Sequence, residues 1–265
     1  LQHREGRHAT PDELALAHEP AYVALVRQLA EQGGGRLDAD TIESDGSWDA
    51  GTAGAGCVLD AVDLALSGEA VRSFSAVRPP GHHALRGSGM GFCLFGNVAI
   101  ASHYARQVKQ LDRVLIVDWD VHHGNGTQAL VEHDPNIRFV SMHQWPWYPG
   151  TGAHDDRGPH GNVWNVPMPA AQPREAYVSA LLGAIDKASE GFTPDLVMIS
   201  AGFDSLAGDP LGGFTLELDD VTRMTRELVS RAEQWCGGRL VSALEGGYAP
   251  QRLGEAAVTH LRALL

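Results

Sequence analysis

The sequence feature that most constrains the fold is a series of short apolar runs, each separated from the next by a helix-like stretch. These runs are rich in Val, Ile, Leu or Phe and have the length of buried strands; they cover residues 71–77, 113–117, 137–142, 195–200 and 239–244. Glycines follow most of them, where tight turns are needed. Strands that alternate with helices in this way predict an α/β fold, in which helices cover both faces of a parallel sheet.

The stretches between these runs have helical patterns, at 97–109, 174–190, 216–235 and 251–264, and two more precede the first run, at 11–32 and 52–66. The glycines 33–35 are expected to end the first helix and not to divide two domains. Segment 144–169, rich in Pro, Gly, Trp and His, is expected to be an irregular functional connection. We therefore expect one domain over residues 1–265.

Charge argues against a nucleic-acid partner. The chain has 20 Lys and Arg against 33 Asp and Glu, a formal net charge of −13, so it lacks the basic surface that tracks phosphates. An acidic surface favours a cationic substrate, such as a lysine-rich tail or a polyamine, by steering it at low salt. An acidic surface is also ordinary for a soluble protein.

Cysteine usage and hydropathy bear on the compartment. The chain has 3 cysteines, an odd number without a CxxC pair, which predicts neither a disulfide framework nor a cysteine zinc knuckle. A reducing, intracellular location in the cytoplasm is therefore expected. No apolar run approaches the ~18 residues of a membrane span, and residues 1–10 are unlike a signal peptide, so no membrane partner is expected.

Polar residues gather directly after four of the predicted strands. The segments that follow are RPPGHH (78–83), DWDVHHGNG (118–126), AGFD (201–204) and EGGY (245–248). Ligands of an open parallel sheet bind beyond the carboxyl ends of its strands. The sequence therefore predicts one site built from these four segments.

A metal would explain the charges in the second and third segments. In an extended chain Asp118, Asp120 and His122 share one face. Two carboxylates and an imidazole there leave charge that a divalent cation compensates, and Asp204 can supply a third ligand. Asp120, His122 and Asp204 with an open position suit a catalytic zinc, although spacing alone also allows iron, cobalt, manganese or a metal-free polar cluster.

Two further groups have the chemistry of a hydrolase. The pair His82 and His83 supplies a candidate general base and acid for an activated water, if it is not simply a loop feature. Tyr248 follows two glycines and can bring its phenol to a developing oxyanion, the alternative being a packed tyrosine with a satisfied hydroxyl.

Taken together, six motifs resemble a class II histone deacetylase or its prokaryotic relatives among the zinc amidohydrolases. They are RPPGHHA (78–84), GFC (91–93), DWDVHHGNGTQ (118–128), YPGTG (148–152), SAGFDSLAGDPLGG (200–213) and EGGY (245–248). The resemblance implies a single α/β domain with a central, mostly parallel, eight-stranded sheet and helices on both faces. It also implies that the chain starts inside the family pattern, without the family's amino-terminal strand and loop.

The resemblance assigns catalytic roles residue by residue. One Zn²⁺ would be bound by Asp120, His122 and Asp204. His83 would act as general base and then acid, beside His82 paired with Asp118, and Tyr248 would polarise the acyl carbonyl. Asn125 would face the second histidine where class I relatives have an aspartate, and a neutral partner keeps more of that imidazole in the base form.

The resemblance also assigns contacts with substrate and a second ion. Phe92, next to Gly91, and Tyr148 would form the two aromatic walls around an acyl-lysine stem. Asp40 would grip the substrate backbone at the rim, or it caps a turn. A potassium ion would lie against five residues, partly through main-chain oxygens: Asp118, Asp120, His122, Ser141 and Met142.

Several functions fit these residues. The first is removal of acetyl groups from lysine side chains of proteins or peptides. The second is hydrolysis of acetylated polyamines, whose selective relatives carry a glutamate gatekeeper beside the Gly-Asp-Pro core; Leu211 stands there and favours acyl-lysine, although Glu217 or rim acids could substitute. A third, of another class, is a non-catalytic acyl-lysine binding domain. A ureohydrolase with two manganese ions would need extra aspartates around Asp204, and Gly202 and Phe203 do not provide them.

Overall fold

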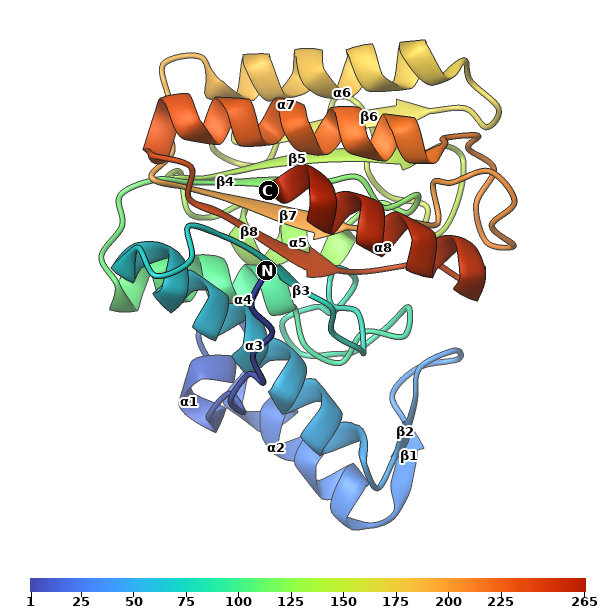
Figure 1. Ribbon diagram of the computed structural model, residues 1–265. Helices are drawn as coiled ribbons and strands as arrows, with labels where there is room; N and C mark the ends of the chain where they lie inside the picture. Colours follow the sequence, from blue (N-terminus) through green and yellow to red (C-terminus); the bar gives the residue numbers. More distant parts are fainter.

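A six-stranded sheet forms the centre of the molecule in the computed structural model, which describes residues 1–265 (Figure 1). Its strand order is β3-β8-β7-β4-β5-β6, and every neighbouring pair is parallel. The strands are β3 (Arg72–Ser75), β4 (Val114–Asp118), β5 (Ile137–Gln144), β6 (Val163–Met168), β7 (Leu196–Ala201) and β8 (Leu240–Leu244). The alternation of strands and helices expected from the sequence is confirmed.

Each face of the sheet builds its own apolar core. In β4, Val114 and Ile116 point to one core and Leu115 and Val117 to the other, as the period of a strand requires. The first core is covered by α1 (Pro11–Leu14), α2 (Pro20–Glu31), α3 (Ser47–Ser67), α4 (Asn97–His103), the π-helical turn η1 (Tyr104–Val108) and α5 (Asn125–Val131). The second is covered by α6 (Arg174–Ser189), α7 (Leu218–Cys236) and α8 (Pro250–Leu264), and Figure 1 shows the two layers.

The path of the chain reverses the order of the strands beside β4. From β4 the chain moves outward to β5 and β6, and it then returns to the other side of β4 to add β7 and β8. The strand order thus reverses between β4 and β7. Ligand sites of open parallel sheets lie at the carboxyl ends of the strands where the order reverses.

The predicted strand number is wrong: the sheet has six strands, where the family resemblance implied eight. Residues before β3 form helices and a separate antiparallel hairpin of β1 (Gly34–Arg36) and β2 (Ile42–Ser44). Strand β6 lies within segment 144–169, which was expected to be irregular. It contains Pro167 and has only two buried residues, Val163 and Asn165, a pattern that an edge strand tolerates but that hides it from a search for apolar runs.

Three helices also differ from expectation. Residues 11–32 form two helices because Glu19 precedes Pro20, and a residue before proline is disfavoured in helical geometry. Helix α5 was not predicted. Helix α3 begins earlier than expected. By length and composition alone it could cross a membrane, whereas the sequence analysis expected no segment of that kind. Its buried side chains pack in the first core, which accounts for its apolar composition.

Candidate metal and catalytic site

Three of the polar segments meet because their strands are neighbours in register. Asp118, the last residue of β4, pairs with Ser200 of β7, and Ala201 of β7 pairs with Leu244 of β8. Residues 118–122, 202–204 and 245–248 therefore leave the sheet at the same edge. The predicted convergence at the carboxyl ends of the strands is confirmed.

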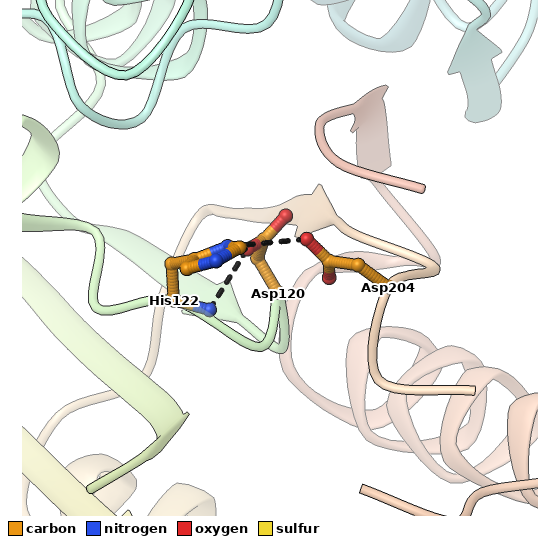
Figure 2. A group of neighbouring side chains, drawn as sticks. All are labelled: Asp120, His122 and Asp204. Carbon is orange, nitrogen blue, oxygen red and sulfur yellow. Dashed lines mark hydrogen bonds and ion pairs between the residues drawn. The ribbon is translucent and has the colours of Figure 1, made fainter. Parts of the chain in front are cut away.

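Asp120, His122 and Asp204 form one compact, buried cluster. One side-chain ligand atom from each lies within 4.8 Å of the others, and the three residues are 0%, 7% and 0% exposed. Figure 2 shows His122 and Asp120 on one loop and Asp204 approaching from the opposite side. Nδ1 of His122 is 3.0 Å from Oδ1 of Asp120 and 3.2 Å from Oδ2 of Asp204.

The electrostatics of this cluster fit a divalent cation. Burial disfavours charge on His122, but Asp120 and Asp204 outweigh burial and raise its pKa to about 10. Burial, with the repulsion of Asp120, raises the pKa of Asp204 to about 7. Oδ2 of Asp204 is buried and accepts no hydrogen bond, and Nδ1 of His122 forms an ion pair with it at 3.2 Å. A bound cation would satisfy such an oxygen in a donor set of two carboxylates and one imidazole, and these three residues can hold one.

Backbone amides hold one oxygen of each carboxylate, Asp120 and Asp204, in place. The amide of Val121 donates to Oδ1 of Asp204 (2.9 Å), and the amide of Gly246 donates to Oδ2 of Asp120 (2.8 Å). A Cβ on Gly246 would lie 2.1 Å from Oδ2 of Asp204 and 2.6 Å from Oδ2 of Asp120. The close approach of this peptide therefore requires glycine.

Replacing Gly246 with alanine is expected to weaken metal binding on the order of 10- to 100-fold, because the methyl group must displace both carboxylates. Titration of the metal-free protein with Zn²⁺ measures the affinity. Gly254→Ala is the matched control, since a Cβ there meets nothing within 4 Å and the position lies in helix α8. Equal affinities in the two variants would show that Gly246 does not position the ligands.

His82 and His83, in the segment RPPGHH, differ in protonation: His82 is charged and His83 is neutral. Burial disfavours charge on His82, but Asp120 and Asp118 outweigh it and hold the pKa of His82 well above its usual value. Its Nδ1 donates to Oδ2 of Asp118 (3.0 Å). Burial, reinforced by the charge of His82, holds the pKa of His83 well below its usual value, so His83 is neutral.

His83 lies beside the cluster and is hydrogen-bonded through one ring nitrogen. Its Nδ1 donates to Oδ1 of Asn125 (2.7 Å), which leaves Nε2 unprotonated. Its ring centroid lies 5.8 Å from that of His122 and 5.1 Å from that of Tyr148. The sequence prediction placed His83, Asn125, His122 and Tyr148 in one site, and the structure brings them together.

Tyr248 lies at the other side of the site. Its ring centroid is 5.8 Å from that of Phe92, and its backbone amide donates to Oδ2 of Asp209 (2.7 Å). Burial, followed by the nearby charges of Asp120 and Asp204, raises the pKa of Tyr248 above its usual value. Its hydroxyl therefore keeps its proton and can donate a hydrogen bond.

The remaining predicted residues lie around this centre. Phe92 and Tyr148 are 41% and 38% exposed, so two aromatic rings next to the site reach the surface. The amide of Leu211 donates to Asp209, and its carbonyl accepts from Nε1 of Trp147 (2.9 Å). Asp40 is exposed and accepts from the amide of Gly91 (3.3 Å).

The residues predicted to bind potassium overlap the candidate metal cluster, because they include Asp120 and His122. Ser141 pairs with Asp118 across β4 and β5, and both Ser141 and Met142 are fully buried. Their backbone therefore adjoins the predicted ligands Asp118, Asp120 and His122. Potassium binding stays a prediction.

Sequence reasoning missed Glu245 as a site residue. Its Oε2 accepts from the amides of Gly81 (2.6 Å) and His82 (3.0 Å), and its Oε1 accepts from the hydroxyl of Ser200 (3.1 Å). This buried carboxylate therefore fixes the loop that carries both histidines against β7. The available signal was a glutamate at the end of an apolar strand, inside the EGGY motif.

Comparison with known proteins agrees with this geometry. The family model described as "Histone deacetylase domain" matches residues 1–264. An uncharacterized protein of Synechocystis, slr0245, is 45% identical over 249 residues, which cover 94% of this chain and 80% of that protein. A histone deacetylase-like amidohydrolase of Pseudomonas aeruginosa is 39% identical over 94% of this chain and 67% of its own length.

Two further relatives extend the comparison. The human polyamine deacetylase HDAC10 is 37% identical over 98% of this chain but 40% of its own length. The crystal structure of the HDA15 HD domain superposes with a TM-score of 0.92 at 35% identity, covering 98% of this chain and 76% of that one. The likeness therefore extends over almost the whole sheet and its helices.

Proposed function

Because the chain belongs to the histone deacetylase family, we propose that it hydrolyses the acetyl or acyl amide of lysine side chains in proteins or peptides, with one zinc ion. The observation that supports this most is the buried Asp120, His122 and Asp204 cluster lying against a neutral His83. Amide hydrolysis needs an electrophilic centre and a base within reach of one water, and this arrangement provides room for both.

The residues divide the reaction between them. A zinc ion bound by Asp120, His122 and Asp204 would polarise the amide carbonyl and the attacking water. Nε2 of His83 accepts the proton of that water, and the amide of Asn125 keeps the imidazole in the tautomer that can do so. His83 then returns the proton to the departing lysine amine.

Two groups stabilise the developing charges. The phenol of Tyr248 donates a hydrogen bond to the carbonyl oxygen as it becomes negative. His82, held protonated between Asp118 and Asp120, stays charged throughout and keeps the neighbouring His83 a weak enough base to release its proton. The alternative of a non-catalytic binding domain has no use for this separation of charge states.

The surroundings favour an acyl-lysine over an acetylated polyamine. Phe92 and Tyr148 offer apolar surface suited to the methylene stem of a lysine. Leu211 lies where polyamine-selective relatives are expected to place a carboxylate, and its backbone is held by Asp209 and Trp147. Leu211 is uncharged, so this position offers no partner for the second ammonium group of a polyamine. The alternative hypothesis, that acetylated polyamines are the substrates, is supported by the relative named polyamine deacetylase HDAC10.

Turnover of an acetyl-lysine peptide and of an acetylated polyamine, measured on the same zinc-loaded sample, tests this choice. We expect the peptide to have the higher kcat/KM. Leu211→Glu should shift the preference toward the polyamine, since it introduces a carboxylate for the second ammonium. Preference of the unaltered protein for the polyamine would overturn the acyl-lysine assignment while leaving the amidohydrolase intact.

A further inference from the structure

The loop that carries Phe92 has an unusual backbone. Gly91 and Phe92 are consecutive residues with φ values of 56° and 67°. The left-handed region is uncommon for a residue with a side chain and is disfavoured for a bulky aromatic. Such a conformation persists only when surrounding contacts hold it, and it is often found at functional sites.

The contacts that hold this backbone come from the hairpin of β1 and β2. The amide of Phe92 donates to the hydroxyl of Thr41 (3.1 Å), and that hydroxyl donates to Oδ1 of Asp40 (3.1 Å). The same carboxylate oxygen accepts from the amide of Gly91 (3.3 Å). Two consecutive amides of the strained loop are thus both satisfied by one pair of adjacent side chains, 51 residues earlier in the sequence.

The hairpin is built to present Thr41 to this loop. Side chains near β2 alternate: Thr41 and Glu43 are 2% and 4% exposed, whereas Ile42 between them is 65% exposed. A cavity of about 200 Å³ lies between the hairpin and the loop and is lined by Asp40, Thr41 and Phe92 among others. The hydrogen bonds of Thr41 and Asp40 join the two segments beside this pocket.

We propose that Thr41 is a positioning residue, whose hydroxyl holds Phe92 in the left-handed conformation that places its ring as a wall of the acyl-lysine slot. This inference rests on the proposed function, because the slot matters only if an acyl chain enters it. Without the hydroxyl the amide of Phe92 loses its acceptor, and the residue can relax to negative φ. The ring then leaves its position 5.8 Å from that of Tyr248.

The proposal also changes the role expected for Asp40. Sequence comparison implied that this carboxylate grips the substrate backbone at the rim. In the structure its Oδ1 is occupied by Gly91 and Thr41, and Oδ2 is the oxygen left for a substrate. Asp40 is therefore available to a substrate through Oδ2 and holds the loop of Phe92 through Oδ1.

A matched pair of variants tests the proposal. Thr41→Val keeps the shape and removes the hydroxyl, whereas Thr41→Ser keeps the hydroxyl. For the zinc-loaded protein, Thr41→Val should raise KM for an acetyl-lysine peptide by roughly tenfold, the typical effect of losing one hydrogen bond, with little change in kcat. Thr41→Ser should restore the original KM. Binding of a hydroxamate with a long alkyl chain should weaken likewise, whereas acetohydroxamate, which has no chain to occupy the slot, should bind equally.

Crystal structures of the variants give a readout independent of activity. We expect φ of Phe92 to become negative in Thr41→Val and to stay positive in Thr41→Ser. Positive φ in both variants, or a KM unchanged in Thr41→Val, would overturn the proposal; Thr41→Ala serves if the valine variant does not fold. If the unaltered protein hydrolyses no acyl-lysine, the proposed function fails, but the backbone measurement still decides whether Thr41 holds Phe92.

Discussion

Replacing Asp204 with alanine is expected to reduce bound zinc from one ion per chain to almost none and to abolish turnover. Asp204 is fully buried, and its Oδ2 accepts no hydrogen bond and forms an ion pair with His122. It is also the only one of the three ligands that comes from the loop after β7, so its loss leaves Asp120 and His122 on a single loop. Metal analysis after desalting measures this loss directly.

A thermal unfolding experiment distinguishes metal loss from misfolding of this variant. Zinc at about 100 times its dissociation constant should stabilise the unaltered protein by roughly 2.7 kcal/mol, and Asp204→Ala by nothing. Asp195→Ala is the control, because Asp195 lies just before the opposite end of β7 and its carboxylate accepts from the amides of Asp112 and Arg113. Full zinc retention by Asp204→Ala would show that the ion binds elsewhere.

Replacing Tyr248 with phenylalanine is expected to lower kcat on the order of 100-fold while zinc stays bound. The change removes one hydroxyl and keeps the ring that packs near Phe92. Burial and two nearby carboxylates hold the phenol protonated, so the lost group is the hydrogen-bond donor that we propose stabilises the developing oxyanion. Removing one such donor typically costs 10²–10³ in kcat.

Steady-state kinetics on an acetyl-lysine peptide, together with metal analysis, checks this second prediction. Tyr104→Phe is a suitable control: its hydroxyl donates to the carboxylate of Asp63 in helix α3, which carries none of the site residues. It should lose some stability and little activity per folded molecule. Full activity in Tyr248→Phe would remove Tyr248 from the mechanism.

Much of the fold and the site could be predicted because the informative residues are local in the sequence. Strands β4, β7 and β8 are continuous apolar runs, as expected of strands buried on both faces, so their ends could be located closely. Since the ends of parallel strands share one edge, the motifs that follow them had to converge. The cluster of Asp120, His122 and Asp204 follows from that rule alone.

The features that sequence could not predict depend on contacts between distant segments. Strand β6 is an edge strand with Pro167, so neither its apolarity nor its backbone pattern marks it as a strand. Glu245 accepts hydrogen bonds from Gly81 and His82, which precede it by 164 and 163 residues in the sequence. The hydrogen bond between Thr41 and Phe92 joins two loops whose sequences give no sign that they meet. Such hydrogen bonds leave no periodic trace in a sequence.

In the proposed function, a single zinc ion and the neutral His83 together hydrolyse an acyl-lysine amide. The most direct test titrates Zn²⁺ into the metal-free protein while acetate release from an acetyl-lysine peptide is followed, with and without a hydroxamate. Activity should rise linearly to a plateau at one ion per chain, and the hydroxamate should abolish it. A plateau at two ions, or no turnover once one ion is bound, would contradict this account.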